Sequence, residues 1–252
     1  MITYEYTDPV AELTIDRPDR ANALSHEDCL DLADGLARAE EDARVAVIRA
    51  ATDATVFCAG DDIQHLDELE TAADLRAHFE LISGVLHGIE ETEIPVIAAV
   101  DGDALGGGCE LVVACDLAVA SEGARFSLPE TRLGTFPSFA VERVAVTGGR
   151  KRVMELVLTG EPISADEASD CGLVNRVVPA EDVDDAVETY VDAIVESPKG
   201  AVTIAKEHAN TRIRDAGEYN RMLGGNALLF SSTETREGVR AFVEGREPSW
   251  RE

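Results

Sequence analysis

The sequence predicts an α/β fold with a helical C-terminal region. Short apolar runs alternate with amphipathic stretches until near residue 180, and only amphipathic stretches follow over 183–244. This alternation is typical of a sheet-based core whose strands are joined by helices. A chain of 252 residues is long enough for one large domain, or for one domain with a small appendage. We therefore expect a core over 1–195 and a helical region over 196–252.

Six short segments carry the strand pattern. Each is apolar or alternates between apolar and polar residues, and they cover 10–15, 45–50, 55–60, 96–100, 117–120 and 173–178. The segments VAVIRA, VIAAV and DLAVAS are each followed by a loop that contains glycine. This recurrence indicates a weak internal repeat.

Helical spacing of apolar residues predicts helices over 26–40, 74–91, 111–115 and 151–158, and a short one after Ser164. Ser25 followed by Asp28 indicates a helix start, and Ser164 with Glu167 has the spacing of an N-terminal capping box. The helical pattern of 183–244 is interrupted at 197–198 by Ser-Pro and at 224–225 by Gly-Gly.

The charge balance is strongly acidic. Fifty Asp and Glu residues oppose 22 Lys and Arg, for a formal net charge of −28. A diffuse acidic surface argues against nucleic-acid binding, which needs a basic footprint, although Arg143, Arg150, Lys151 and Arg152 form a candidate local basic patch. Self-repulsion of this size is relieved by salt. We therefore expect a cytoplasmic protein of a halophile that accumulates salt.

Other classes of protein are disfavoured. The chain has no apolar run of membrane-spanning length, and its N-terminal residues lack a signal-peptide pattern. Five cysteines without a C-x-x-C pair indicate reduced thiols, with Cys109 and Cys115 as small apolar residues of the interior. The five histidines are scattered along the sequence. No His or Cys group has the spacing of metal ligands, so we expect no metal.

The stretch ALGGGCEL, at 104–111, places three glycines before an acid in an apolar run. A dinucleotide fingerprint needs glycine at position 111, which is Leu111. The stretch is therefore either an ordinary tight turn or a helix start whose amides face a developing negative charge. In the first case Glu110 only complements the helix dipole. In the second it serves as a base.

Two further stretches allow the same two interpretations. FCAGDDI, at 57–63, is a strand followed by a turn with exposed amides, or else a solvated acidic turn. SLPETRLG, at 127–134, contains Glu130 after a proline, which also fits a plain helix start. Two amide-rich turns and two acids, separated by strands, together suggest a site for enolate chemistry.

An ordered set of motifs runs through the whole chain. It comprises RPDRANAL, FCAGDDI, ALGGGCEL, CDLAVA, PETRLG, TGEPISADEASDCGLVN and REGVRAFVEGREPSW. This set resembles the enoyl-CoA hydratase/isomerase (crotonase) family. The resemblance implies the ClpP/crotonase fold, a right-handed spiral of ββα units, with a C-terminal helical region that forms trimers or dimers of trimers.

The resemblance also implies a division of roles. The backbone amides of Asp61 and Gly107 would hold the thioester oxygen, with the Asp61 carboxylate turned away. Glu110 would activate a water, and Glu130 would protonate C2. The acyl-CoA is the expected ligand, and coenzyme A enters only as part of this substrate, with no metal or redox cofactor. The residues expected to bind it are Ala21, Ala23, Ala59, Asp61, Asp62, Ile63, Gln64, Gly107, Pro137 and, from the same or a neighbouring subunit, Phe242.

Three positions depart from the family pattern. Ser138, Phe139 and Ala140 follow Pro137 where hydratases commonly have a run of small residues, so Phe139 adds bulk beside the acyl pocket. Gln64 and Gly245 stand where relatives have cations for the CoA phosphates. Two alternatives to hydration therefore stay open: a double-bond isomerase that uses Glu130 alone, and a non-catalytic binding protein on the same fold.

Overall fold

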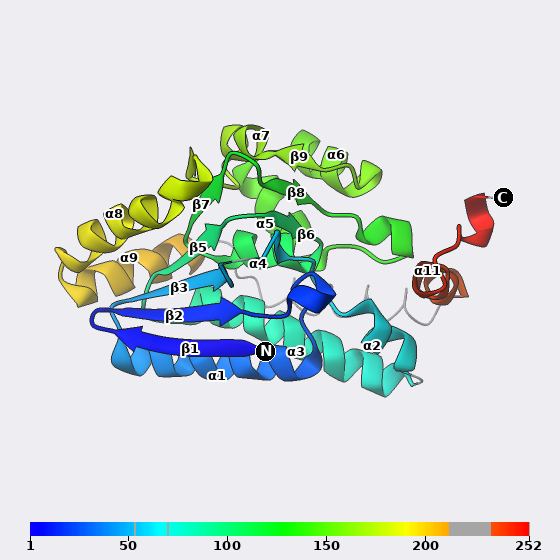
Figure 1. The fold of residues 1–252 in the computed structure, drawn as a ribbon, viewed down its shortest axis with the longest axis horizontal. Helices are drawn as coiled ribbons and strands as arrows, with labels where there is room; N and C mark the ends of the chain where they lie inside the picture. The colour runs from blue at the N-terminus through cyan, green and yellow to red at the C-terminus, as the bar shows by residue number, and fades with distance from the viewer. Residues whose placement is uncertain (53, 70, 212–232, 252) are drawn as a thin grey trace.

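The computed structural model describes residues 1–52, 54–69, 71–211 and 233–251 (Figure 1). Its larger sheet has six strands in the order β1-β2-β3-β5-β7-β10. The first strand pairs antiparallel with the second, and all the other pairs are parallel. The strands are β1 (Ile2–Thr7), β2 (Val10–Ile15), β3 (Val45–Ala50), β5 (Val96–Val100), β7 (Leu117–Ser121) and β10 (Arg176–Val178).

A smaller sheet lies beside it, in the order β4-β6-β8-β9. It contains β4 (Val56–Cys58), β6 (Asp103–Leu105), β8 (Arg125–Ser127) and β9 (Ile163–Ser164). The pairs β3/β4, β5/β6 and β7/β8 each place one strand in the larger sheet and the next in the smaller. This repeat, in which the chain advances by one strand in both sheets, confirms the internal repeat predicted from VAVIRA, VIAAV and DLAVAS.

Period-two alternation divides the larger sheet between two apolar clusters. Ala46 and Ile48 of β3 belong to the main core, whereas Val45 and Val47 face a second cluster. Helix α8 (Val183–Val195) closes that second cluster. The main core is covered by α1 (His26–Asp42) and α3 (Ala72–Glu91), which run side by side beneath the sheet in Figure 1.

The remaining helices are α2 (Ile63–Glu68), α4 (Gly107–Ala114), α5 (Ser138–Thr147), α6 (Arg150–Thr159), α7 (Ala165–Asp170), α9 (Lys199–Thr211) and α11 (Thr233–Val243). The described residues also form four 3₁₀ turns: η1 (Pro18–Arg20), η2 (Glu130–Leu133), η3 (Ala180–Asp182) and η4 (Ser249–Arg251). Within the described ranges, no helix is both long enough and apolar enough to span a membrane.

A buried lysine fastens α9 to the core. The Nζ atom of Lys206 donates to the carbonyl oxygens of Ile89 and Ile94 and lies 2.7 Å from Oδ2 of Asp116. The start of the predicted C-terminal region therefore packs on the core. The division at 195/196 stays a prediction.

Most elements were predicted close to their positions. The capping box predicted at the start of α7 is present, and the helix start predicted at Ser25 also forms a capping box, at the start of α1. The strand expected over 55–60 spans only Val56–Cys58, the one expected over 173–178 only Arg176–Val178, and the helix expected over 111–115 begins earlier, at Gly107. The break at 197–198 separates α8 from α9, whereas 224–225 lies outside the described residues.

Candidate active site

One cavity of about 300 Å³ gathers most of the predicted site residues. Its wall is mainly apolar and is built by the turn after β4, by α2, α3, α4, η2 and α5, and by α11. The predicted residues on this wall are Ala59, Asp61, Ile63, Gly107, Glu110, Glu130 and Phe242.

Two backbone segments meet at one end of the cavity. A methyl group on Gly60, which has a φ of +90°, would lie 2.7 Å from the nitrogen of Gly107. A methyl group on Gly108 would lie 2.1 Å from the carbonyl oxygen of Cys58. Only glycine allows this approach. The glycine triplet therefore brings the start of α4 against the turn that holds Asp61.

The two amides expected to form an oxyanion hole are both available. Leu24 pairs with the segment at residue 61 by donating to Gly60 and accepting from Asp62. The N–H of Asp61, which lies between them, therefore points away from Leu24. Gly107 is the first residue of α4, so its N–H has no acceptor within the helix. Both residues line the cavity.

Glu110 is held at the start of a neighbouring helix. Its Oε1 accepts the backbone N–H groups of Phe139 and Ala140, both at 2.9 Å. The residue is only 8% exposed. Burial raises the pKa of Glu110 to about 7, against the lowering effect of the two amides and of Arg143. At neutral pH the side chain is therefore poised between acid and base.

Glu130 lies at the start of η2 in a different environment. Both of its carboxylate oxygens are buried and have no hydrogen-bond partner among the described residues. Burial raises the pKa of Glu130 well above its ordinary range, and the charge of Glu110 raises it further. The two environments separate the two acids: the amides of Phe139 and Ala140 favour the ionised form of Glu110, whereas only the backbone amide of Glu130 itself favours an ionised Glu130.

The Asp61 side chain has a partner of its own. Its Oδ2 lies 2.8 Å from Nε2 of His78 on α3. His78 is 2% exposed, and its Nδ1 has no partner among the described residues. The Asp61 carboxylate is thus held by the His78 imidazole. This agrees with the expected role of Asp61, in which only its backbone N–H would contact the thioester oxygen.

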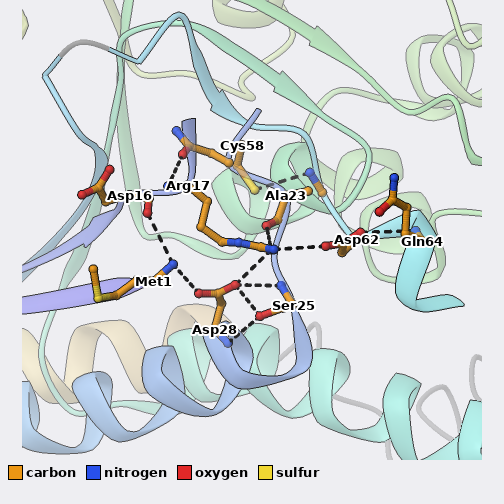
Figure 2. Close-up of polar contacts among 11 residues, drawn as sticks. Met1, Asp16, Arg17, Ala23, Ser25, Asp28, Cys58, Asp62 and Gln64 are labelled. Atoms are coloured by element: carbon orange, nitrogen blue, oxygen red, sulfur yellow. Dashed lines mark hydrogen bonds and ion pairs between the residues drawn. The ribbon is translucent and has the colours of Figure 1, made fainter. Parts of the chain in front are cut away.

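Arg17 ties the neighbouring loop to the same turn (Figure 2). Its guanidinium lies 3.2 Å from Oδ2 of Asp28 in α1 and 3.2 Å from Oδ2 of Asp62. Asp62 caps α2 by accepting the N–H of Gln64. Asp62 therefore fixes the turn beside the Asp61 amide, through its ion pair with Arg17 and its cap on α2.

Five predicted ligand residues do not line the cavity: Ala21, Ala23, Asp62, Gln64 and Pro137. Ala21 accepts the N–H of Ala59 through its carbonyl oxygen, and Gln64 accepts from Arg20 on the exposed side of the loop. Phe242 lies on the wall of this chain's own cavity but is 61% exposed.

The sequence pattern of the enoyl-CoA hydratase/isomerase family matches residues 5–252. The chain belongs to this family. It is 33% identical over 254 aligned residues to a probable enoyl-CoA hydratase of Mycobacterium bovis, covering 99% of this chain and 97% of the relative.

Solved structures agree with this membership. A putative enoyl-CoA hydratase from Mycobacterium avium paratuberculosis has a TM-score of 0.88 at 30% identity, with full coverage of both chains. A methylmalonyl-CoA decarboxylase in complex with 2-nitronate-propionyl-CoA also scores 0.88, at 26% identity, covering 98% of this chain and 97% of the other. The predicted crotonase fold is confirmed.

Phe139, the bulky residue that stands where hydratases commonly have a small one, is packed tightly into the wall of the cavity. Its ring is 1% exposed, with the guanidinium carbon of Arg143 4.0 Å from its centroid and the His87 ring at 5.4 Å. Arg143 in turn lies 3.0 Å from Glu90, and both side chains are buried. Arg143 therefore does not belong to the predicted basic surface patch, because its guanidinium is buried and paired with Glu90.

Sequence reasoning missed three features of the site. The amide donors to Glu110 are backbone groups, and the only hint was that Phe139 and Ala140 follow a proline. The partner of Asp61 comes from α3, which carries no motif. The histidines are scattered along the sequence, but the fold brings His26, His65 and His78 together, with ring nitrogens of all three within 4.8 Å of one another.

Proposed function

We propose that this chain catalyses the reversible hydration of a 2-trans-enoyl-CoA to a 3-hydroxyacyl-CoA. The observation that carries the proposal is the convergence of Glu110 and Glu130 in one apolar cavity with the amides of Asp61 and Gly107. The hydratase names of the relatives support it, and the fold by itself is compatible with other thioester reactions.

The proposed roles follow from the two carboxyl environments. The bonds from α5 both end on Oε1 of Glu110, so we assign the other oxygen to the attacking water. Glu110 takes a proton from this water as its oxygen bonds to C3. The resulting enolate oxygen accepts from the two amides, each such donor contributing about 10²–10³ in rate. Glu130, held protonated, then gives its proton to C2.

The reaction is tested with crotonyl-CoA. Addition of water removes the conjugation between the double bond and the thioester, so absorbance falls as product forms. We expect this fall, together with a 3-hydroxyacyl-CoA product identified by mass. A chain that is folded and binds the thioester but gives no such product would contradict the proposal and favour the non-catalytic alternative.

A double-bond isomerase is the second candidate. It is favoured by the carboxyl of Glu130, which has no hydrogen-bond partner among the described residues and can move a proton between two carbons of an enoyl chain without Glu110. A 3-enoyl-CoA substrate separates the two reactions, because isomerisation creates the conjugated absorbance that hydration removes. Decarboxylation, the reaction named for the decarboxylase of similar structure, is tested by supplying a 2-carboxyacyl-CoA and measuring the release of CO₂.

We further propose a homotrimer, or a dimer of trimers, working in a salt-rich cytoplasm. Phe242, Val243 and Trp250 at the C-terminal end are 61%, 42% and 46% exposed, and a subunit contact would cover such apolar side chains. Sedimentation equilibrium in concentrated KCl tests the assembly. A monomer at micromolar concentration would contradict it. The proposed chemistry uses only carboxyl and amide groups and requires no cofactor.

A further inference from the structure

Three histidines converge beside the cavity without lining it. His26 is the first residue of α1, His65 lies in α2 and His78 in α3. The ring centroids of His26 and His65 are 6.2 Å apart, and those of His65 and His78 are 5.2 Å apart. One ring nitrogen of each lies within 4.8 Å of the other two. The three side chains therefore meet where three helices meet.

His78 has the hydrogen bonding of a metal ligand. With Nε2 donating to the Asp61 carboxylate, its Nδ1 carries a free lone pair, and this nitrogen is buried with no partner among the described residues. A buried polar atom left unpaired destabilises the folded chain. Histidines that bind metals usually give their other ring N–H to a carboxylate, which fixes the tautomer and the ring orientation.

The surrounding charge favours a cation. Asp61 contacts His78, and Oε2 of Glu68 lies 4.0 Å from Nδ1 of His65. A metal ion bound between the three rings would be balanced by these two carboxylates. It would also supply the partner that Nδ1 of His78 lacks among the described residues.

We propose that His26, His65 and His78 bind one divalent transition-metal ion such as Zn²⁺, with Asp61 orienting His78. Three imidazoles suit this class of metal, at metal–nitrogen distances of about 2.0–2.1 Å. In a tetrahedral site with bonds of this length, the ligand nitrogens lie about 3.4 Å apart. The three rings must therefore move closer to one another than the 4.8 Å within which their nitrogens now lie. His26 is exposed and His65 half-buried, so both have room to rotate. The fourth position is left for water.

The bound ion acts on the active site through Asp61. It joins α1, α2 and α3, and through His78 it fixes the carboxylate of Asp61, the residue whose N–H is assigned to the thioester oxygen. It also stabilises the folded chain, because the ligands are assembled only when the chain is folded. This binding does not depend on the proposed hydratase activity: a chain without thioester turnover would still bind the metal.

The test uses the full chain, freed of metal with a chelator and titrated with ZnCl₂ by calorimetry and with CoCl₂ by visible absorption. We expect one ion per chain and the intense visible bands of tetrahedral Co²⁺. His26→Gln and His65→Gln should each lose this binding, whereas His208→Gln, on the exposed face of α9, should keep it. Asp61→Asn should weaken it about 10–100-fold.

Two results would overturn the proposal. One is a wild-type chain that shows no saturable binding when ZnCl₂ is in large excess. The other is a His26→Gln/His65→Gln double variant that is folded by circular dichroism and binds as the wild type does, which would place the ion on thiols or surface carboxylates.

Discussion

Oε1 of Glu110 lies 2.9 Å from the backbone nitrogen of Phe139, at the first turn of α5. This contact joins the one acid in the apolar helix α4 to the segment that departs most from the hydratase pattern. The bulk of Phe139 and the support of Glu110 thus come from the same turn. A change in this turn acts on both the acyl pocket and the proton chemistry.

Glu110→Gln and Glu130→Gln should each lower kcat for crotonyl-CoA by about 10²–10⁴-fold, the usual contribution of general acid–base catalysis. Both changes keep the shape of the side chain and remove its titratable proton. Steady-state kinetics measure the effect, with Glu181→Gln, an exposed acid of η3, as the matched control. Near-wild-type turnover in either site variant would rule out a two-acid mechanism.

The pH profile of kcat/KM should be bell-shaped. Glu110 must be ionised to accept a proton from water, and its pKa is about 7, so the rate should rise with pH through that region. Glu130 must be protonated, and its raised pKa should produce a decline at higher pH. Because the acids interact, the two midpoints belong to the pair. A profile that is flat from weakly acidic to weakly alkaline pH would contradict this assignment.

The same raised pKa predicts a pH-dependent stability. The side chain of Glu in an unfolded chain has a pKa of about 4.3. Between that pH and about 7, Glu110 is therefore protonated more often in the folded state than in the unfolded state. Its contribution to the free energy of unfolding therefore falls as pH rises through this window. Glu110→Gln removes the effect, so the variant should gain stability relative to wild type between about pH 5 and about pH 8. Urea unfolding of both proteins at both pH values measures the difference in their free energy of unfolding. If this difference is the same at both pH values, the raised pKa of Glu110 is contradicted.

Phe139→Leu should shift the substrate preference toward longer acyl chains. The smaller side chain opens the cavity wall and loses the contact with the Arg143 guanidinium. Ratios of kcat/KM for short- and medium-chain 2-enoyl-CoA thioesters measure the shift. Phe57→Leu is the control, since Phe57 is fully buried away from the cavity. Both variants should lose about 0.5–3 kcal/mol of stability, but only Phe139→Leu should change the ratio.

The fold was predictable wherever local chemistry decides it. Strand β5 is buried along its whole length, so its apolar run was sufficient, and Ser25 with Asp28 marked the start of α1. Three strands of the smaller sheet, β6, β8 and β9, escaped prediction because none is longer than three residues, which is too short for an alternating pattern to be recognised. Their pairing depends on contacts distant in sequence.

The site was predictable only in part. Glu110 stood out because an acid in an apolar run needs a reason, and the family resemblance then assigned its role and that of Glu130. Its amide donors could not be seen, because every residue has an N–H and only the fold aims it. The three histidines likewise share no spacing, since three separate helices bring them together.

Concentrated salt should stabilise the folded protein. The net charge of −28 leaves a large excess of carboxylates after every basic residue is paired, and their repulsion is strongest in the compact state. At about 1 M salt the screening length falls to about 3 Å, so the repulsion fades. Thermal unfolding should shift to higher temperature between dilute buffer and concentrated KCl. Sucrose, which strengthens burial without screening charge, is the control. Undiminished stability in dilute buffer, or an equal shift in sucrose, would show that charge repulsion is not the cause.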